Sequence, residues 1–374
     1  MLVAYTDQNE PFILHTSISQ STLYQLRKTK KFFCPLCKQP LLFKIGSIKV
    51  PHFAHYPQDT LCENLFSEKE SEVHLKGKEQ LFNLFKVLGL KAELESYLPN
   101  IKQRPDVLLK EKNQQFAIEF QCSPISKERL TERNSGYKVE GIAPIWIPNT
   151  PAKIIKKGIQ KISLNKNYQL FKLAPHTHPY IMSYNPIMQQ FFYISNLMFL
   201  QGNSFISKVQ TIPLENQRFP FYEPKQITIS EFKQFFLIYQ QVKHNYLKRR
   251  VLLSRTGVND LLLRSAYELR MDLNTLPNYI GIPIKGSEIL KEFSVDWQLA
   301  LFFYIYTTKI EINNLSGQTI YDYLKWARMP VVKEAFEAVN NYCKLLKKLS
   351  VKHSYQTIQE HKLMEVLYTH FLAL

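Results

Sequence analysis

Two acidic residues, Asp106 and Glu119, lie in neighbouring strand-like segments with twelve residues between them. If these segments pair as a hairpin, the carboxylates lie side by side and repel each other unless a cation bridges them. Mg²⁺ (or Mn²⁺) takes such oxygen ligands and can activate water against a phosphodiester. Because residues i and i+2 of a strand share a face, Gln121 projects beside Glu119 and could place that water. The spacing therefore indicates a metal-dependent nuclease site.

The helices expected on either side offer further polar groups. His74 and Lys78 share one helix face at four-residue spacing, and Lys78 could stabilise phosphate charge. Glu72 falls on a different face and is one more acid that could reach a metal. The following helix carries a stripe that could bind DNA phosphates: Arg129, Arg133 and Tyr137. The plainer alternative is that such a stripe is a solvated face and that an acid at a strand end is a turn residue.

A second group of metal-ligating residues precedes this region. Cys34 and Cys37 form a C-x2-C knuckle, and fourteen residues separate Cys37 from the pair His52 and His55. Thiolate and imidazole are good Zn²⁺ ligands, so the four could close a tetrahedral site that stabilises a small module. The H-x2-H spacing is tighter than in zinc fingers, so Cys62 is an alternative fourth ligand. The alternative to a zinc site is a pair of buried thiols with two polar histidines.

The elements that would position these residues alternate in type. Residues 1–65 form a β-rich Cys/His module, and residues 66–150 read as helix, three strands, helix and strand, a compact mixed α/β layer. Residues 151–374 form a basic, mainly helical region with a possible boundary near 228. A lysine-rich linker is expected over 149–166. The proline-interrupted, aromatic-rich segment 170–230 does not specify a fold, and a small β-rich piece is one interpretation.

Charge points to the class of partner. Lys and Arg exceed Asp and Glu by 48 − 31 = 17, and residues 151–374 hold 28 basic and 15 acidic residues. A basic excess favours a polyanion such as nucleic acid, although an organism that favours lysine would also produce it. The apolar runs are too short to span a membrane, and the first twelve residues lack a secretory pattern, so we expect a cytoplasmic location.

The whole set of motifs resembles the CoiA competence proteins. The residues that carry the resemblance are Cys-Pro-Leu-Cys at 34–37, His-Phe-Ala-His at 52–55, Pro-Asp at 105–106 and Glu-Phe-Gln-Cys-Ser-Pro at 119–124. The resemblance is specific over about residues 1–150. It implies a PD-(D/E)XK nuclease fold with an αβββαβ core, and a role in natural transformation and recombination of incoming single-stranded DNA.

Within that family pattern, Asp106 matches the aspartate of the PD motif and Glu119 the acid of the (D/E)XK half. Gln121 stands where the lysine would be, which also looks usual for this family. A neutral amide can orient water but cannot stabilise charge as an ammonium does, so Lys78 or Lys138 would have to supply the cation.

Three hypotheses follow. The first is a Mg²⁺-dependent nuclease, or nuclease-like protein, that processes DNA in competence. The second is a non-catalytic adaptor with a degenerate site that binds DNA or recombination proteins. A zinc-stabilised protein with incidental charge is the third, plainer reading. Alanine at Asp106 and at Glu119 separates the first two.

Overall fold

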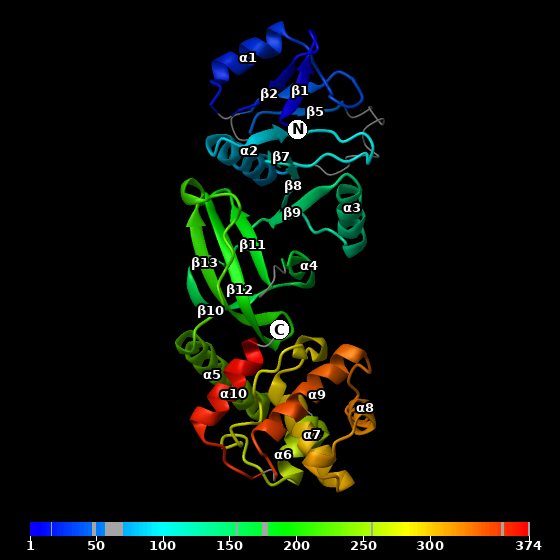
Figure 1. The fold of residues 1–374 in the computed structure, drawn as a ribbon, viewed down its shortest axis with the longest axis vertical. Coiled ribbons are helices and arrows are strands. Elements are labelled where there is room, and N and C mark those ends of the chain that lie inside the picture. The colour runs from blue at the N-terminus through cyan, green and yellow to red at the C-terminus, as the bar shows by residue number, and fades with distance from the viewer. Residues whose placement is uncertain are drawn as a thin grey trace.

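The fold of the chain is known from a computed structural model, which describes residues 1–15, 17–46, 50–56, 70–154, 156–173, 179–255, 257–352 and 355–372. Four parts follow one another along the long axis of an elongated molecule (Figure 1). They are a small β module, a mixed α/β layer, an antiparallel sheet and a helical part. The chain therefore has the mixed α/β architecture with a helical C-terminal part that the sequence predicted.

The N-terminal module contains a three-stranded sheet, one helix and a two-stranded hairpin. Its elements are β1 (Val3–Thr6), β2 (Pro11–Ile13), α1 (Gln20–Thr29), β3 (Phe32–Phe33), β4 (Leu42–Lys44) and β5 (His52–Ala54). The sheet has the order β2-β1-β3, and β4 pairs with β5. Four aromatic rings, those of Phe12, Phe32, Phe43 and Phe53, contact one another in its small core. Cys62 lies outside the described residues.

The mixed layer has the predicted order of helix, three strands, helix and strand. Its elements are α2 (Glu72–Val87), β6 (Lys91–Leu94), β7 (Val107–Glu111), β8 (Gln114–Gln121), α3 (Lys127–Val139) and β9 (Ile142–Pro148). The sheet order is β6-β7-β8-β9, with antiparallel pairs up to β8 and a parallel pair between β8 and β9. The expected hairpin of the two acidic segments therefore forms.

The third part corrects two expectations, because much of residues 149–228 is β structure. Its elements are β10 (Gly158–Ser163), α4 (Lys166–Gln169), β11 (Tyr180–Asn185), β12 (Gln190–Gln201), β13 (Ser204–Pro213) and the 3-10 turn η1 (Leu214–Asn216). The sheet has the antiparallel order β10-β13-β12-β11. The expected lysine-rich linker contains the strand β10, and the long helices of the "mainly helical" region begin only at Ile229, after the single turn of α4. Buried strands such as β12 lack polar alternation, so periodicity alone could not identify them.

The C-terminal part is a bundle of helices packed around α7, which is buried over most of its length. Its elements are α5 (Ile229–Leu253), η2 (Gly257–Asn259), α6 (Leu261–Glu268), η3 (Ser287–Leu290), α7 (Ser294–Thr308), η4 (Ile312–Asn314), α8 (Gly317–Trp326), α9 (Lys333–Lys348) and α10 (Glu360–Leu372). Thr228 caps α5 in a capping box with Glu231. Within the described chain, no helix combines the length and apolarity needed to cross a membrane.

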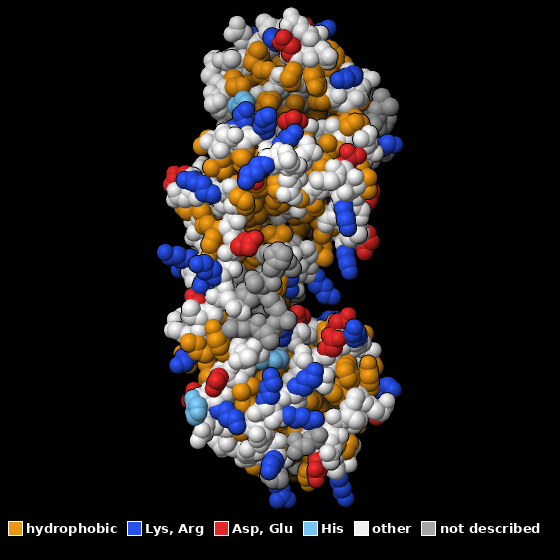
Figure 2. All heavy atoms as spheres, viewed as in Figure 1, with side chains coloured by type: hydrophobic (Ala, Val, Ile, Leu, Met, Phe, Trp, Pro, Cys, Tyr) orange, Lys and Arg blue, Asp and Glu red, His pale blue; other side chains and the backbone are white. Residues whose placement is uncertain are grey.

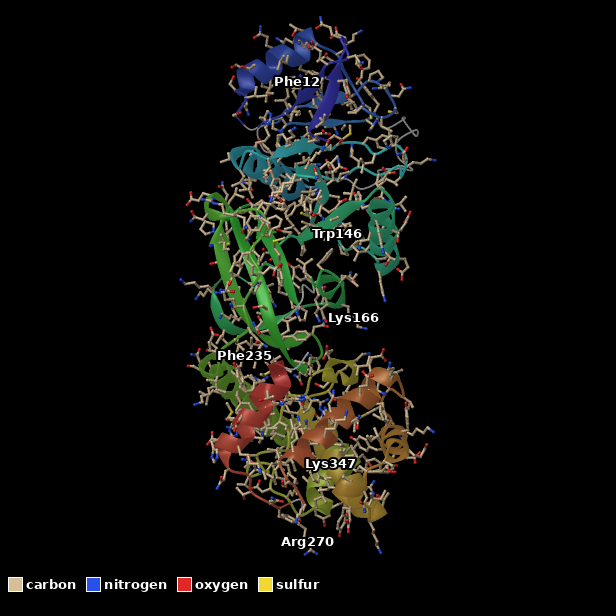
Figure 3. The ribbon with its side chains drawn as sticks, in the orientation of Figure 1. Phe12, Trp146, Lys166, Phe235, Arg270 and Lys347 are labelled. Atoms are coloured by element: carbon tan, nitrogen blue, oxygen red, sulfur yellow. The ribbon has the colours of Figure 1, made fainter. Side chains whose placement is uncertain are left out.

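The parts are held together by shared hydrophobic contacts. One core joins the N-terminal module, α2, the mixed sheet and one face of the second sheet, and a separate core fills the helical part. Figure 3 shows Phe12 and Phe235 far apart along the molecule, and each belongs to, or packs against, one of these two cores. Lys and Arg side chains are scattered over the visible face of the helical part (Figure 2).

Candidate active site

The hairpin of β7 and β8 brings Asp106 and Glu119 to one end of the mixed sheet. Val107 pairs with Ile118, so Asp106 directly precedes one strand position and Glu119 directly follows its partner. The backbone amide of Phe120 donates a hydrogen bond to Asp106 Oδ2 over 2.8 Å. Glu119 is buried, and the side chain of Asp106 is 13% exposed. The two carboxylates nevertheless have different side-chain partners, and these partners come from the two helices that flank the sheet.

The first turns of α2 supply the partners of Asp106. Ser71 caps the helix by accepting from the amide of His74, which directs the His74 ring toward the sheet. His74 Nε2 lies 3.0 Å from Asp106 Oδ2, and the ring stacks on Phe120 with centroids 6.0 Å apart. Burial disfavours the imidazolium, yet the Asp106 carboxylate outweighs burial and raises the pKa of His74. Burial acts against the Asp106 carboxylate too, but His74 and Lys78 lower the pKa of Asp106 to about 2.

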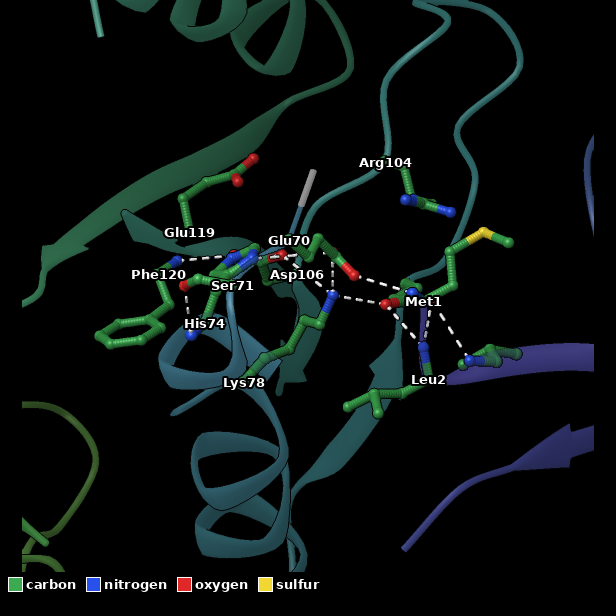
Figure 4. Close-up of polar contacts among 12 residues, drawn as sticks. Met1, Leu2, Glu70, Ser71, His74, Lys78, Arg104, Asp106, Glu119 and Phe120 are labelled. Carbon is green, nitrogen blue, oxygen red and sulfur yellow. Dashed lines mark hydrogen bonds and ion pairs between the residues drawn. The ribbon is translucent and has the colours of Figure 1, made fainter. Parts of the chain in front are cut away.

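Lys78 is the buried cation at the centre of this cluster (Figure 4). Its ammonium donates to Glu70 and Glu95, and Nζ lies 3.7 Å from Asp106 Oδ1. Burial by itself lowers the pKa of Lys78, but the three carboxylates together raise it above its usual value. The ammonium is therefore held charged beside Asp106.

The N-terminal module covers this side of the site. Glu95 is 4% exposed and its carboxylate accepts from the amide of Leu2 over 3.1 and 3.2 Å and from that of Val3 over 3.3 Å. The ammonium of Met1 lies 2.8 Å from Glu70 Oε2. Burial disfavours the ionised form of Glu95, but Lys78 outweighs it and lowers the pKa of this acid. The module and the mixed layer thus share one polar cluster.

Glu119 has a separate set of partners from α3. The side chains of Arg133 and Tyr137 both donate to its carboxylate, and Arg133 Nη2 also lies 2.9 Å from the Tyr137 hydroxyl. The guanidinium further lies 5.5 Å from the ring centroid of Trp146. Burial raises the pKa of Glu119 to about 7 despite the neighbouring Arg133. Arg133 and Tyr137, expected to bind DNA, here hold an acid of the candidate site.

The remaining predicted residues lie further from the two acids. Gln121 projects from the end of β8, and its amide donates to Ser123 O over 2.9 Å. Arg129 is exposed and pairs with Glu132 over 2.8 Å. Lys138 lies exposed in the last turn of α3, so Lys78 and not Lys138 is the lysine that the fold places beside Asp106.

Three donors converge as a possible metal site: Glu70 lies just before α2, His74 in its first turn, and Asp106 just before β7. One ligand atom each from Glu70, His74 and Asp106 lies within 4.8 Å of the others. Two carboxylates and an imidazole are a donor set that suits a divalent cation, so the residues present fit the implied group. The sequence predicted Glu119 as the second metal ligand beside Asp106. In the structure Glu70 and His74 converge on Asp106 instead, and the Glu119 carboxylate accepts from Arg133 and Tyr137.

Glu70 and Glu95 are the two site residues that sequence reasoning missed. Glu70 lies four residues before His74 and eight before Lys78. This i, i+4 spacing is a sequence signal that places Glu70, and not Glu72, on the face of His74 and Lys78. Glu72 is exposed at the start of α2. Glu95 offered no local signal, because its partners are Lys78, Leu2 and Val3, which come from two other parts of the chain.

The predicted zinc ligands converge in part. Ligand atoms of Cys34, Cys37 and His55 lie within 4.8 Å of one another, with Cys37 Sγ 3.4 Å from His55 Nε2. His52 lies outside this trio, in β5, and its Nδ1 lies 2.9 Å from Val50 O. Two thiols and an imidazole fit a zinc site that lacks one ligand. Cys62, the alternative fourth ligand, lies outside the described residues.

Comparison with known proteins identifies the family of the chain. Residues 15–63 match the family model "Competence protein CoiA, N-terminal domain", and residues 70–226 match "Competence protein CoiA, nuclease-like domain". The chain is 29% identical over 326 residues to "Competence protein CoiA" of Bacillus subtilis (strain 168), an alignment that covers 86% of this chain and 79% of that protein. No solved structure matches the chain. The chain belongs to the CoiA family of competence proteins and contains that family's nuclease-like domain.

Proposed function

We propose that this chain is a metal-dependent phosphodiesterase that processes incoming DNA, chiefly single-stranded, during natural transformation. The observation that carries the proposal is the convergence of Glu70, His74 and Asp106 beside the buried ammonium of Lys78. It lies within a nuclease-like domain, next to the second acid of the sheet. Action on incoming DNA places the protein in the cytoplasm, with recombination proteins as natural partners.

The fixed charges of the site suit a divalent cation and a phosphate. Glu70 and Asp106 supply oxygen ligands, and His74 can add its nitrogen after releasing its proton. Mg²⁺ or Mn²⁺, when bound, supplies a Lewis acid that polarises the phosphodiester and favours hydroxide near neutral pH. Lys78 holds a positive charge beside Asp106, the place where negative charge develops on the phosphate. It thereby provides the charge that Gln121 cannot.

In a second arrangement of the site, Glu119 would leave Arg133 and Tyr137 and bind the metal. If Glu119 turns toward a cation bound by Asp106, Arg133 loses its carboxylate partner and its guanidinium becomes available for bidentate contact with phosphate. Gln121, on the same strand face as Glu119, is then placed to orient water. Arg133 would thus serve first as the partner of an acid and then as a phosphate ligand.

The second candidate function is a DNA-binding adaptor with a degenerate site. One observation favours it: the Glu119 carboxylate is already paired with Arg133 and Tyr137, and the Gln121 amide with Ser123 O. An acid held in this way is not free to bind a metal. In this reading the buried cluster stabilises the fold, and the basic surface of the helical part binds DNA or recombination proteins.

A cleavage assay on the full chain separates the two functions. The substrates are single- and double-stranded oligonucleotides labelled at either end, with Mg²⁺, Mn²⁺ or chelator. The variants are Asp106→Asn and Glu119→Gln, which keep side-chain volume. The control is Glu140→Gln, an exposed acid at the end of α3 with no ion-pair partner among the described residues.

If the chain is a nuclease, we expect metal-dependent cleavage that falls at least 100-fold in both site variants. Cleavage by Glu140→Gln should stay within twofold of the wild type. DNA binding in chelator should be unchanged in all variants. Binding without cleavage in the wild type, under every metal condition, would establish the adaptor instead. Cleavage that survives both substitutions would show that the acids are not the site.

We further propose that Zn²⁺ closes the cluster of Cys34, Cys37 and His55 and stabilises the N-terminal module. The module is small, with elements that span residues 3–54, and its few buried apolar residues include Leu14, Leu23, Phe32 and Phe53. Metal binding supplies folding free energy to modules of this size. Because the backbone of Leu2 and Val3 binds Glu95, a folded module also keeps the nuclease-like site covered on one side.

A further inference from the structure

A basic hollow lies outside the nuclease-like site, where the second sheet meets the end of α5. It has a volume of about 510 Å³ and is lined by residues from three places in the fold. Lys161 comes from β10, Gln201 from the end of β12, and the others from the last turns of α5 and the loop after it, including Arg249, Arg250 and Arg255. A volume of this order is typical of ligand pockets.

The hollow carries an excess of uncompensated positive charge. Lys161, Arg249 and Arg255 are exposed and have no ion-pair partner in the described part of the chain. Asp260 is the one acid that lines the hollow, and its carboxylate is 2.8 Å from Arg250 Nη2. Three free cations therefore face one space, and their mutual repulsion favours an anion there.

Arg250 gives the hollow a fixed cationic wall. Its guanidinium is held by Asp260 and lies 3.6 Å from Asp296 Oδ1, while Tyr246 donates to both oxygens of Asp296 over 2.8 and 2.7 Å. Asp260 is itself fixed, because it caps α6 by accepting from the amides of Leu262 and Leu263. The buried Nε of Arg250 has no hydrogen-bond partner among the described residues. One donor of a rigid guanidinium thus remains unused.

Stabilisation of α5 does not account for this arrangement. Basic residues near a helix C-terminus interact favourably with its dipole, and Arg250 lies in the last turn of α5. Lys161, however, comes from a strand nearly ninety positions earlier in the chain, and Arg255 follows the helix. The convergence of these two residues on the hollow needs another reason.

We propose that the hollow binds phosphates of a single nucleic acid strand, with Lys161, Arg249 and Arg255 as phosphate ligands and Arg250 as the fixed wall. Several separate, exposed cations suit a polyanion, which contacts them together and releases counterions. The solvent-exposed apolar residues of α5 beside the hollow, Leu252 (70% exposed) and Leu253 (73%), offer surface for the bases. The proposal takes its ligand class from the proposed function, but binding here requires no hydrolysis.

The test measures binding of the full chain to a fluorescent oligothymidylate in chelator at several salt concentrations. The test variant replaces the three free cations: Lys161→Gln, Arg249→Gln and Arg255→Gln together. The control removes the same number of charges from exposed lysines elsewhere in the helical part: Lys233→Gln, Lys325→Gln and Lys344→Gln. Inorganic phosphate and thymidine monophosphate serve as competitors.

We expect the test variant to bind at least tenfold more weakly at about 0.1 M salt, while the control stays within threefold. The slope of log K against log salt should fall by about 2, since each phosphate contact to a single strand contributes about 0.7. Equal losses in test and control variants would overturn the site. If thymidine monophosphate competed as effectively as the oligonucleotide, the hollow would not be a site for a nucleic acid strand. Because the assay is run in chelator, it requires no hydrolysis, and its result is separate from the fate of the nuclease proposal.

Discussion

Gly77 of α2 packs directly against the ring of Phe120 in β8. A Cβ placed on Gly77 would lie 2.2 Å from Cε1 of that ring. Non-bonded carbon atoms do not come so close, so the contact needs glycine. It lets the helix that carries His74 and Lys78 approach the strand whose Phe120 amide binds Asp106. The geometry of the polar cluster therefore depends on an apolar contact.

Alanine at Gly77 should destabilise the protein. The added methyl group must displace the buried Phe120 ring, and overpacking of this kind costs about 1–3 kcal/mol, partly offset by the roughly 1 kcal/mol better helix propensity of alanine. Urea unfolding measures the net cost. Gly136→Ala in α3 is the control, because a Cβ there meets only the flexible end of Gln103. A Gly77→Ala protein more stable than the Gly136→Ala protein would contradict the packing argument.

Loss of the Lys78 ammonium should be costly whether or not the site cleaves DNA. Lys78→Met removes the cation shared by Glu70, Glu95 and Asp106 and leaves buried carboxylates uncompensated. Breaking such a buried arrangement typically costs about 3–5 kcal/mol. Lys86→Met, at an exposed position in the last turn of the same helix, should cost less than about 1 kcal/mol. Similar unfolding midpoints for the two variants would show that the cluster contributes little.

Zinc binding should depend on only one histidine of the H-x2-H pair. His55→Ala and Cys34→Ser should lower the zinc content of the purified chain, whereas His52→Ala should retain one equivalent, because its ring lies outside the converging trio. Atomic emission spectrometry gives the metal content. Cys62→Ser then tests the fourth ligand. A loss of zinc in His52→Ala equal to that in His55→Ala would restore the original four-residue assignment.

Lys243 of α5 should make the free energy of unfolding depend on pH in the alkaline range. Burial lowers the pKa of Lys243 to about 8, against 10.5 for an ordinary lysine. Between these values the unfolded chain binds more protons than the folded one, so stability contributed by this group rises with pH, and below pH 8 the buried charge is a full cost. Lys243→Met should therefore be more stable than the wild type at pH 7, by up to about 3 kcal/mol, and the gain should fade by pH 10.5.

The exposed Lys233 on the same helix is the matched control for that comparison, and Lys233→Met should not change the pH dependence. The hydrogen bond from Lys243 Nζ to Ile280 O, 3.2 Å long, is lost in the methionine variant and reduces the gain. A Lys243→Met protein less stable than the wild type at pH 7 would show that this bond outweighs the burial of charge.

Sequence patterns predicted the local features of this protein because each rests on residues close together in the chain. The β7–β8 hairpin follows from two apolar segments around a polar turn, and its pairing places Asp106 and Glu119 together. The order of elements in the mixed layer and the helices after Ile229 follow from periodicity and caps in the same way. The Cys34–Cys37 knuckle likewise needs only local chain reversal.

Only the tertiary structure decided which side chains meet. Glu95 joins Lys78 and the amide of Leu2, which are 17 and 93 residues away, and no local pattern encodes such contacts. The pairing of Glu119 with Arg133, the separation of His55 from His52, and the hollow between Lys161 and Arg255 arise in the same way. Burial selects these partners, because a charged group removed from water must be matched by whatever the packed chain brings beside it.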